Sequence, residues 1–293
     1  MARKDIRPCV VAVIGGSGLY KMEGLTEKEE LSVDTPFGPP SDAILTGTLS
    51  GVRCAFLPRH GRDHTLLPSE INARANIWAL KSLGAQKIIS FGAVGSLQEA
   101  MAPGHFTIPD QIVDKTVLRR TTFFGNGIVA HVPFAEPFCA HMRAVLQTSA
   151  KGLNIRVHEK GTLVCMEGPL YSTRAESHTH RKLGYDIIGM TTIPEAKLAR
   201  EAELCYAMTA MVTDYDCWKE GEEVSTEKVI SVMHANSANA QRLLAAAIAQ
   251  IAKLPACACN DALKNAIMTR PEAMPRETAE KLRLLIDKHV KIA

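Results

Sequence analysis

The chain has 293 residues, of which 46% are hydrophobic, and 34 basic against 31 acidic side chains give a net charge of +3 at pH 7. This even balance argues against a nucleic-acid surface, and no apolar run approaches the roughly 20 residues that span a bilayer. The first eight residues contain no signal-peptide apolar segment, so we expect a cytoplasmic protein that binds neither nucleic acid nor membrane.

Short apolar runs alternate with amphipathic segments, which is typical of a mainly parallel sheet covered by helices. We expect strands at residues 9–14, 52–57, 87–92, 106–113, 161–166, 186–190 and 205–212. We expect helices at about 69–83, 137–150, 173–183, 194–203, 226–252 and 276–290, the first capped by Ser69 and the long one by Ser225. The sequence therefore predicts an α/β fold as a single domain over residues 1–293, in which a mixed, mostly parallel central sheet is flanked by helices and a C-terminal helical tail begins at about residue 253.

Two loops that follow expected strands are suited to binding an anion. In Gly15–Gly18 the glycines let backbone N–H groups approach closely and Ser17 adds a hydroxyl, although such a segment is as often a plain tight turn. Arg59 and His60 follow the strand 52–57 and offer a guanidinium and an imidazole. Because ligands collect at the carboxyl ends of strands in open α/β sheets, the two loops together favour a phosphate site.

Two further segments leave strands at the same edge of the expected sheet. Thr191 precedes a helix start, where N–H groups favour an anion, but it could equally be a simple helix cap. Residues 91–96 leave a strand through two glycines, and a plain strand-to-helix turn competes with a binding role. Ser172 stands at the start of another expected helix, so it is either an N-cap or a ligand contact. For His131 too, the residues alone do not decide between a structural role and a ligand contact.

Asp214 and Asp216 follow the apolar run 205–212. Since a strand alternates its faces with period two, its end would aim both carboxyl groups the same way. Such a pair can protonate one ligand atom and bind another, which suits the basic N7 and the exocyclic amino group of adenine. A solvated acidic loop is the competing interpretation.

The chain has eight cysteines, and Cys9, Cys54, Cys165 and Cys205 lie in apolar runs where a thiol behaves as a small hydrophobic group. Cys257 and Cys259 are the exception, because they share a proline-containing loop. One Cys-x-Cys without a second pair is a weak zinc signal. A redox-sensitive dithiol and an incidental pair of free thiols are the alternatives, of which the second is favoured.

Taken in order, these segments resemble the methylthioadenosine phosphorylases, within the purine nucleoside phosphorylase superfamily. The likeness covers about residues 10–250, and its landmarks are Ile14–Leu19, Asp34–Gly38, Pro58–Arg62, Asn76–Leu80, Glu167–Pro169, Arg174–Glu176, Met190 and Thr191, Pro194 and Glu195, and Thr213–Trp218. Each landmark is weak alone, but so many in order are specific.

The resemblance implies a nucleoside phosphorylase-like fold and a pentosyltransferase that acts in purine and methionine salvage. The implied reaction is reversible phosphorolysis of S-methyl-5′-thioadenosine to adenine and 5-methylthioribose 1-phosphate, with inorganic phosphate as co-substrate, no metal or organic cofactor, and a homotrimer or hexamer as the assembly. A purine nucleoside phosphorylase of broader specificity is the alternative. A dinucleotide-dependent oxidoreductase is disfavoured because Lys21 replaces the third glycine of that fingerprint, and a noncatalytic nucleoside-binding protein is the third possibility.

The resemblance also assigns site residues. It places phosphate at Ser17, Arg59, His60, Gly92, Ala93 and Thr191. Gly92 stands where many relatives carry a hydroxyl, so that contact is either missing or made by the backbone. The implied nucleoside contacts are Met190 at the ribose, Asp214 and Asp216 at adenine with Ser172 nearby, His131 in the 5′ pocket of a neighbouring subunit, and Thr226 beside the 5′ group. Asp214 is the expected general acid, and Thr226 replaces an apolar residue of the animal enzymes, which argues against a strict methylthio preference.

Overall fold

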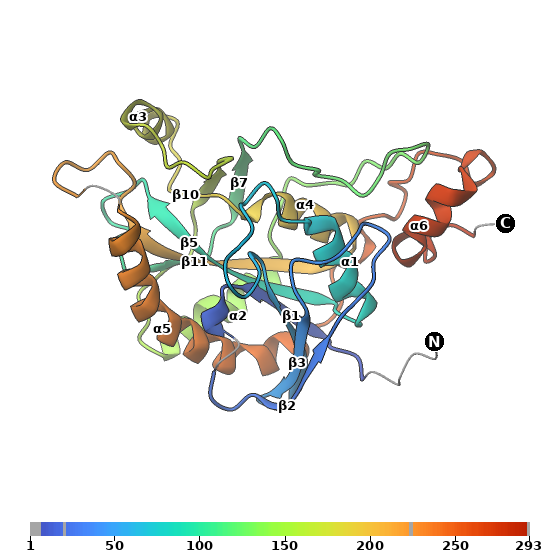
Figure 1. Cartoon of the computed structure of the whole chain (residues 1–293), viewed down its shortest axis with the longest axis horizontal. Coiled ribbons are helices and arrows are strands. Elements are labelled where there is room, and N and C mark those ends of the chain that lie inside the picture. The colour runs from blue at the N-terminus through green and yellow to red at the C-terminus, as the bar shows by residue number, and fades with distance from the viewer. Residues whose placement is uncertain (1–6, 20–21, 223–224, 292–293) are drawn as a thin grey trace.

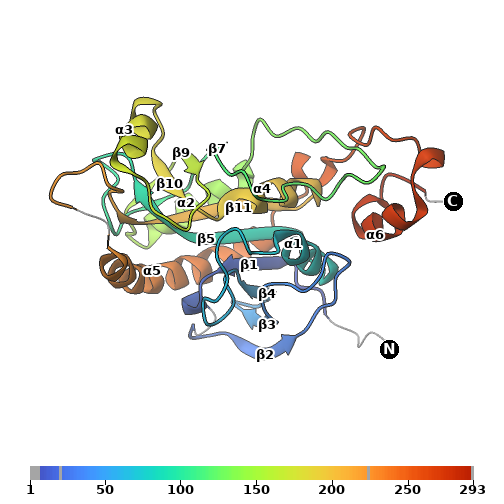
Figure 2. The ribbon, with the colours of Figure 1, turned by 45° about the horizontal axis from the view of Figure 1, so that its top comes forward.

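A mixed β-sheet runs through the centre of the molecule and is covered by helices on both faces (Figures 1 and 2). The computed structural model describes residues 7–19, 22–222 and 225–291, with only the backbone described at Ser17. The strands of this described part are β1 (Val11–Gly15), β2 (Thr26–Leu31), β3 (Ile44–Leu49), β4 (Val52–Pro58), β5 (Lys87–Ser96), β6 (Phe106–Thr107), β7 (Gln111–Asp114), β8 (Val157–His158), β9 (Thr162–Cys165), β10 (Ile187–Gly189) and β11 (Cys205–Asp214). The helices are α1 (Ala73–Ser82), α2 (Ala140–Gly152), α3 (Arg174–Lys182), α4 (Thr192–Glu201), α5 (Thr226–Ala252) and α6 (Arg276–Ile286), with short 3₁₀ helices η1 (Ser17–Leu19), η2 (Ala258–Asp261) and η3 (Pro271–Ala273).

The helices divide between the two faces of the sheet. The long α5 lies beside α2 under one face, and α1 and α4 cover the other (Figure 2). Each face has its own apolar core, because strand residues that point alternately up and down are buried on both sides. Ser225 caps α5 as predicted, its hydroxyl accepting a hydrogen bond from the backbone N–H of Lys228 at 3.3 Å.

The central strand β5 changes neighbours along its length, and this positions the site. On one edge it pairs with β11 from Lys87 to Gly95. On its other edge β5 pairs with β1 in parallel only as far as Ser90, and it pairs with β10 antiparallel at Gly95 and Ser96. Residues 91–94 therefore face no strand on that edge, which leaves a gap in the sheet. Such a break, where strands diverge, is where α/β sheets bind ligands.

The structure confirms the predicted α/β class and the mostly parallel core, and it corrects several details. The strand predicted at 106–113 is two strands, β6 and β7, which pair with different neighbours. Pro109 separates them because it has no N–H to donate to a ladder. The charged edge strand β2, together with β3 and β8, was not predicted, and the N-cap of α1 is Asn72 instead of Ser69.

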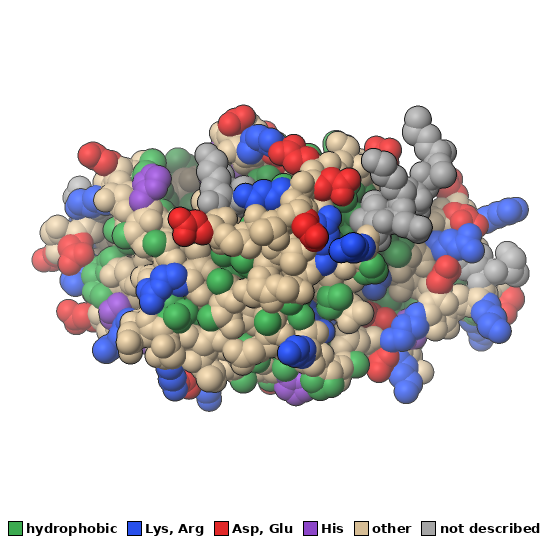
Figure 3. Space-filling view, turned by 90° about the horizontal axis from the view of Figure 1, so that it is seen from below, with side chains coloured by type: hydrophobic (Ala, Val, Ile, Leu, Met, Phe, Trp, Pro, Cys, Tyr) green, Lys and Arg blue, Asp and Glu red, His purple; other side chains and the backbone are tan. Residues whose placement is uncertain are grey.

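The surface view in Figure 3 shows acidic and basic side chains interspersed on this face, as expected from a nearly balanced charge. Among the helices of the described residues, none combines the length and the apolar character that a membrane crossing requires.

Candidate active site

The carboxyl group of Asp214 lies at the end of β11, beside the gap in the sheet. Its Oδ2 accepts a hydrogen bond from the Thr213 hydroxyl at 2.7 Å and its Oδ1 accepts one from the backbone N–H of Asp216 at 2.8 Å. Burial raises the pKa of Asp214 and the nearby charge of Asp216 adds to this, although the two hydrogen bonds oppose it. The result is a carboxyl group that keeps its proton to a higher pH than usual.

Asp216 is the second acid of the pair, and it is buried with an unsatisfied oxygen. The residue is 4% exposed, and its Oδ2 has no hydrogen-bond partner within the described part of the chain. Its backbone has φ of 51°, a left-handed conformation that a side chain rarely adopts. A strained backbone that holds an unpaired, buried acceptor indicates a ligand position, because an unmade hydrogen bond is costly in a protein interior.

Gly95 on β5 lies directly against both acids and leaves them room. A Cβ atom at this position would lie 2.9 Å from Asp214 Oδ1 and 3.4 Å from Asp216 Cβ. Asp214 is also the register partner of Gly95 across the β5–β11 ladder. The absence of a side chain at residue 95 therefore sets the position of the carboxyl pair.

Ser172 lies near the acid pair and does not cap a helix. Thr173 is the N-cap of α3 and forms a capping box with Glu176. Ser172 is 9% exposed, and its carbonyl oxygen accepts a hydrogen bond from the Cys217 thiol, next to Asp216 in the chain. The N-cap interpretation of Ser172 is therefore wrong, and its hydroxyl lies 3.8 Å from Met166 Sδ.

Met190 and Thr191 follow β10 and are held by one buried arginine. Arg119 donates hydrogen bonds to the carbonyl oxygens of Met190 and Ile193, and to the Glu167 carbonyl at 2.6 Å. It also forms an ion pair with the Glu167 carboxylate, 2.9 Å between Nε and Oε1. The Thr191 side chain makes no capping bond to α4, so its hydroxyl is available to a ligand.

The edge of β5 beside this segment offers a backbone donor. The Phe91 carbonyl faces the gap, because it accepts a hydrogen bond from Arg59. The Ala93 carbonyl faces the same way, since it lies 3.8 Å from where a Gly189 Cβ would stand. Successive residues of a strand point their amides to opposite edges, so the Ala93 N–H also faces the gap and that of Gly92 faces β11. Ala93 is exposed although it lies on the central strand.

Arg59 is buried beneath this edge in a dense polar network. Its guanidinium pairs with Glu195, 2.5 Å between Nε and Oε1, and donates to the Ser90 hydroxyl at 2.7 Å. Glu195 also accepts a hydrogen bond from the Tyr206 hydroxyl at 3.0 Å. The guanidinium thus lies behind residues 90 and 91 with its charge balanced by Glu195.

His60 is half-buried next to Arg59, and its ring Nδ1 lies 2.8 Å from the Leu66 carbonyl oxygen. That carbonyl can only accept, so Nδ1 carries the proton and Nε2 is the second, unprotonated nitrogen in the neutral ring. Burial lowers the pKa of His60 to about 4, because the charged form is poorly solvated. The ring is therefore neutral near pH 7.

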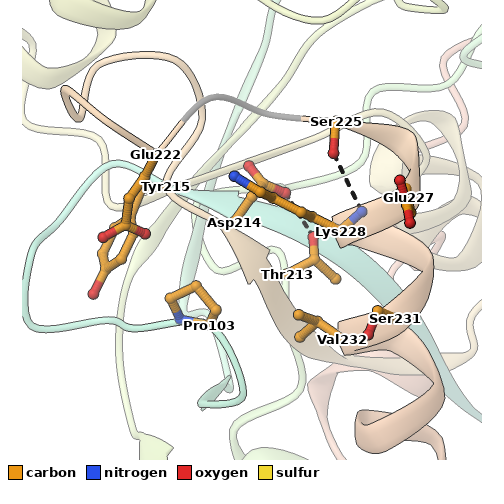
Figure 4. A pocket seen from close by; sticks show the side chains of 10 residues that line it. All are labelled: Pro103, Thr213, Asp214, Tyr215, Glu222, Ser225, Glu227, Lys228, Ser231 and Val232. Carbon is orange, nitrogen blue, oxygen red and sulfur yellow. Dashed lines mark hydrogen bonds between the residues drawn. The ribbon is translucent and has the colours of Figure 1, made fainter.

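A cavity of about 580 Å³ opens beside the acid pair (Figure 4). Thr213, Asp214 and Tyr215 form its inner wall, and Pro103 faces Ser231 and Val232 of α5 across it; the other lining residues are Glu222, Ser225, Glu227 and Lys228. Thr226, at the start of α5, is exposed and is not among the lining residues, although both of its neighbours are. The side chain of Ser17 lies outside the described part of the structure.

Of the predicted site residues, Asp214 is among those that line this cavity, and His131 lies in a different part of the molecule. It is exposed, and its backbone N–H donates to the Ala266 carbonyl at 2.9 Å. Figure 1 shows the green loop that carries it running beside the C-terminal segment, at the end of the molecule away from α3 and the start of α5. Within one chain His131 is therefore separate from the acid pair.

Comparison with known proteins assigns the chain to a family. A sequence model described as the phosphorylase superfamily matches residues 10–249. The chain belongs to the phosphorylase superfamily. S-methyl-5′-thioadenosine phosphorylase of Geobacter sulfurreducens is 52% identical over 283 residues, which cover 96% of this chain and 99% of that protein. The corresponding protein of Chloroflexus aurantiacus is 53% identical over 274 residues, 93% of this chain and 95% of the other.

Solved structures of the superfamily agree with this fold. A methylthioadenosine phosphorylase from an Antarctic soil metagenomic library superposes with a TM-score of 0.92 at 49% identity, covering 95% of this chain and 99% of that one. Methylthioadenosine phosphorylase from Schistosoma mansoni in complex with adenine gives 0.84 at 38% identity, with 88% and 98% covered. These matches confirm the nucleoside phosphorylase fold that the sequence predicted.

The contacts of three residues in this candidate site were not predicted from the sequence. Arg119 lies in a loop with no local pattern, and only the tertiary structure shows that it binds the Met190 segment. Gly95 was noted as part of a turn, but its contact with Asp214 depends on strand register. Glu195 was noted at a helix start, and its pairing with Arg59 joins residues 136 positions apart.

Proposed function

We propose that the chain catalyses the reversible phosphorolysis of S-methyl-5′-thioadenosine to adenine and 5-methylthioribose 1-phosphate. Relatives with this activity in their names cover nearly the whole chain at 52% and 53% identity. The structural observation that carries the proposal is the acid pair at the end of β11, placed beside the strand-free edge of β5. One part of the site suits a purine and the other suits an anion, which are the two reactants.

The acid pair is proposed to hold the adenine ring. Protonated Asp214 donates to N7, and the raised pKa of this carboxyl keeps the proton available. Asp216 Oδ2, which has no partner among the described residues, accepts from the exocyclic amino group. Ser172, whose carbonyl oxygen accepts a hydrogen bond from the thiol of Cys217, is proposed to lie at the edge of the ring, and Met190 is proposed to lie against the ribose.

The strand-free edge is proposed to hold phosphate. The Ala93 N–H and the Thr191 hydroxyl face it, and His60, Arg59 and Ser17 complete the set. Gly92 contributes no donor, because its amide faces β11; a Cβ there would be in ordinary contact with Thr191 Oγ1 at 3.7 Å and tight against Met208 Cε at 3.1 Å. The Arg59 guanidinium forms an ion pair with Glu195, so its charge would act on both the phosphate and the Glu195 carboxylate. Its hydrogen bond to the Ser90 hydroxyl would also hold residues 90 and 91 in position.

In the proposed reaction a phosphate oxygen attacks C1′ while the C1′–N9 bond breaks through an oxocarbenium-like state. The electron pair of the broken bond passes to the purine, and the Asp214 proton on N7 neutralises the leaving base. Orientation of the two reactants and charge complementarity supply the rate, with phosphate as co-substrate and no metal or organic cofactor. His131 is proposed to enter the 5′ pocket of a neighbouring copy, which requires a homo-oligomer, and Thr226 to lie near the 5′ group.

The direct test is adenine release from S-methyl-5′-thioadenosine with and without inorganic phosphate. We expect release only with phosphate, together with a phosphorylated methylthiosugar. Release without phosphate would indicate a hydrolase and overturn the proposal. Parallel assays with adenosine and inosine measure specificity, and inosine turnover equal to that of methylthioadenosine would favour a broader purine nucleoside phosphorylase.

A further inference from the structure

Four cysteines from three distant segments converge at the end of the sheet opposite the acid pair. Cys139 is the N-cap of α2, Cys205 begins β11, and Cys257 and Cys259 flank the start of η2. Their sulfur atoms all lie within 4.8 Å of one another, and none of the four is in a disulfide. Three of the four residues are buried and Cys257 is half-buried. The Cys-x-Cys motif thus has the partners that the sequence did not reveal.

The spacing of these sulfur atoms fits a tetrahedral metal ion. Zn²⁺ binds thiolate at about 2.3 Å, so two ligands of a tetrahedral Zn(Cys)₄ centre stand about 3.8 Å apart. Cys257 Sγ lies 3.9 Å from Cys139 Sγ and 3.4 Å from Cys205 Sγ. Cys257 thus approaches two thiols at once instead of pairing with one. Four sulfur ligands without an oxygen donor select a soft or borderline metal such as zinc.

The backbone fixes three of the ligands. The Cys139 N–H donates to the Tyr206 carbonyl at 2.8 Å, and the Cys205 N–H to the Gln86 carbonyl at 3.0 Å. The Asn260 side chain accepts from the Cys257 N–H at 3.0 Å and donates to the Glu203 carbonyl at 3.1 Å. Ligands that are already held in place lose little conformational freedom when a metal binds.

We propose that Cys139, Cys205, Cys257 and Cys259 form a structural Zn²⁺ site. Four protein ligands close the coordination sphere, which is the arrangement of structural and not catalytic zinc. β11 runs from Cys205 to Asp214, so the metal lies about 30 Å from the acid pair at about 3.3 Å per residue. Binding converts the thiols to thiolates, releases their protons to solvent, and ties the segment after α5 to the sheet.

The test starts with metal content. The chain is purified under reducing, anaerobic conditions without chelator, and zinc is measured by mass spectrometry against protein concentration. We expect one zinc per chain, and a cobalt-substituted sample with the visible ligand-field bands and near-ultraviolet charge-transfer band of tetrahedral cobalt thiolate. Removal of the metal should lower Tm, while the kcat of adenine release at a temperature below both transitions changes little.

Variants separate this site from other thiols. The double variant Cys257→Ser and Cys259→Ser should lose the zinc and the cobalt spectrum, whereas Cys54→Ala, a buried thiol outside the cluster, should keep both. Protein that takes up neither metal with all thiols reduced would overturn the proposal, and so would a disulfide among the four under these conditions. Should the double variant not fold, the stoichiometry and spectrum of the unmodified chain decide the matter.

Discussion

Gly95→Ala is predicted to impair catalysis without unfolding the protein. The new Cβ would lie 2.9 Å from Asp214 Oδ1 and 3.0 Å from Ile188 Cγ2, whereas ordinary contact begins at 3.4 Å, so the carboxyl must move by about 3.4 − 2.9 = 0.5 Å and the Ile188 methyl by slightly less. A misplacement of about 1 Å at a reacting group can cost about 100-fold, so half that distance predicts roughly a tenfold loss of kcat/KM, about 1.4 kcal/mol. The loss should fall on kcat, since the proton donor moves while the phosphate edge is retained.

The assay is steady-state phosphorolysis of methylthioadenosine, with Tm measured on the same samples. Gly161→Ala is the matched control, because its Cβ would lie 3.2 Å from Thr107 Cγ2 and meets neither acid of the pair. We expect near-normal kinetics from this control. A folded Gly95→Ala protein with undiminished kcat would refute the argument that residue 95 sets the position of Asp214.

Three further predictions address other parts of the site. Asp214→Asn should reduce the turnover of adenine nucleosides and favour 6-oxopurine nucleosides. In the unmodified protein kcat should fall as the pH rises through the raised pKa of Asp214, because only the protonated carboxyl group donates, and the substitution should remove this fall. Profiles of kcat against pH with methylthioadenosine and inosine test both expectations. Arg119→Met removes the ion pair with Glu167 and the donor to the carbonyl oxygens of Met190 and Ile193. It should lower the unfolding free energy by about 3 kcal/mol, measured by urea titration, and raise KM. Arg62→Met, in an exposed ion pair, should change both little. Without phosphate, the unfolding free energy should fall by about 3 kcal/mol as the pH drops from above 6.5 to about 4, because over this range His60 is protonated in the unfolded chain but still neutral in the folded protein. Urea titrations at several pH values should show this dependence, and it should be smaller in His60→Gln.

The sequence predicted the elements that carry strong apolar patterns and missed those without them. β1, β5 and β11 are buried on both faces and read as continuous apolar runs, whereas β2 is an exposed edge strand of mostly charged residues. Residues 106–113 form two strands because Pro109 has no N–H to donate to a strand ladder, and the presence of this proline in the sequence is a signal for such a break.

For the site, motifs located the residues, but register and tertiary contacts gave their relations. The side chains of Asp214 and Asp216 were expected to point the same way. In the structure Asp214 Oδ1 accepts a hydrogen bond from the backbone N–H of Asp216, and this bond depends on the left-handed backbone conformation of Asp216. Likewise, the sequence left open whether Gly92 contacts the anion through its backbone, and only strand alternation on β5 indicates which amides face the gap. Arg119 has no local signal at all.

The change of neighbours along β5 separates two functions within one strand. The two acids proposed to bind the purine come from β11 and the turn after it, while the residues proposed to bind the anion lie at or after the ends of β1, β4 and β10 and on the open side of β5. Substitutions in the first group can therefore alter which nucleobase is accepted while the chemistry with inorganic phosphate is preserved. An architecture of this kind lets evolution diversify base preference by changing the residues around a single strand end.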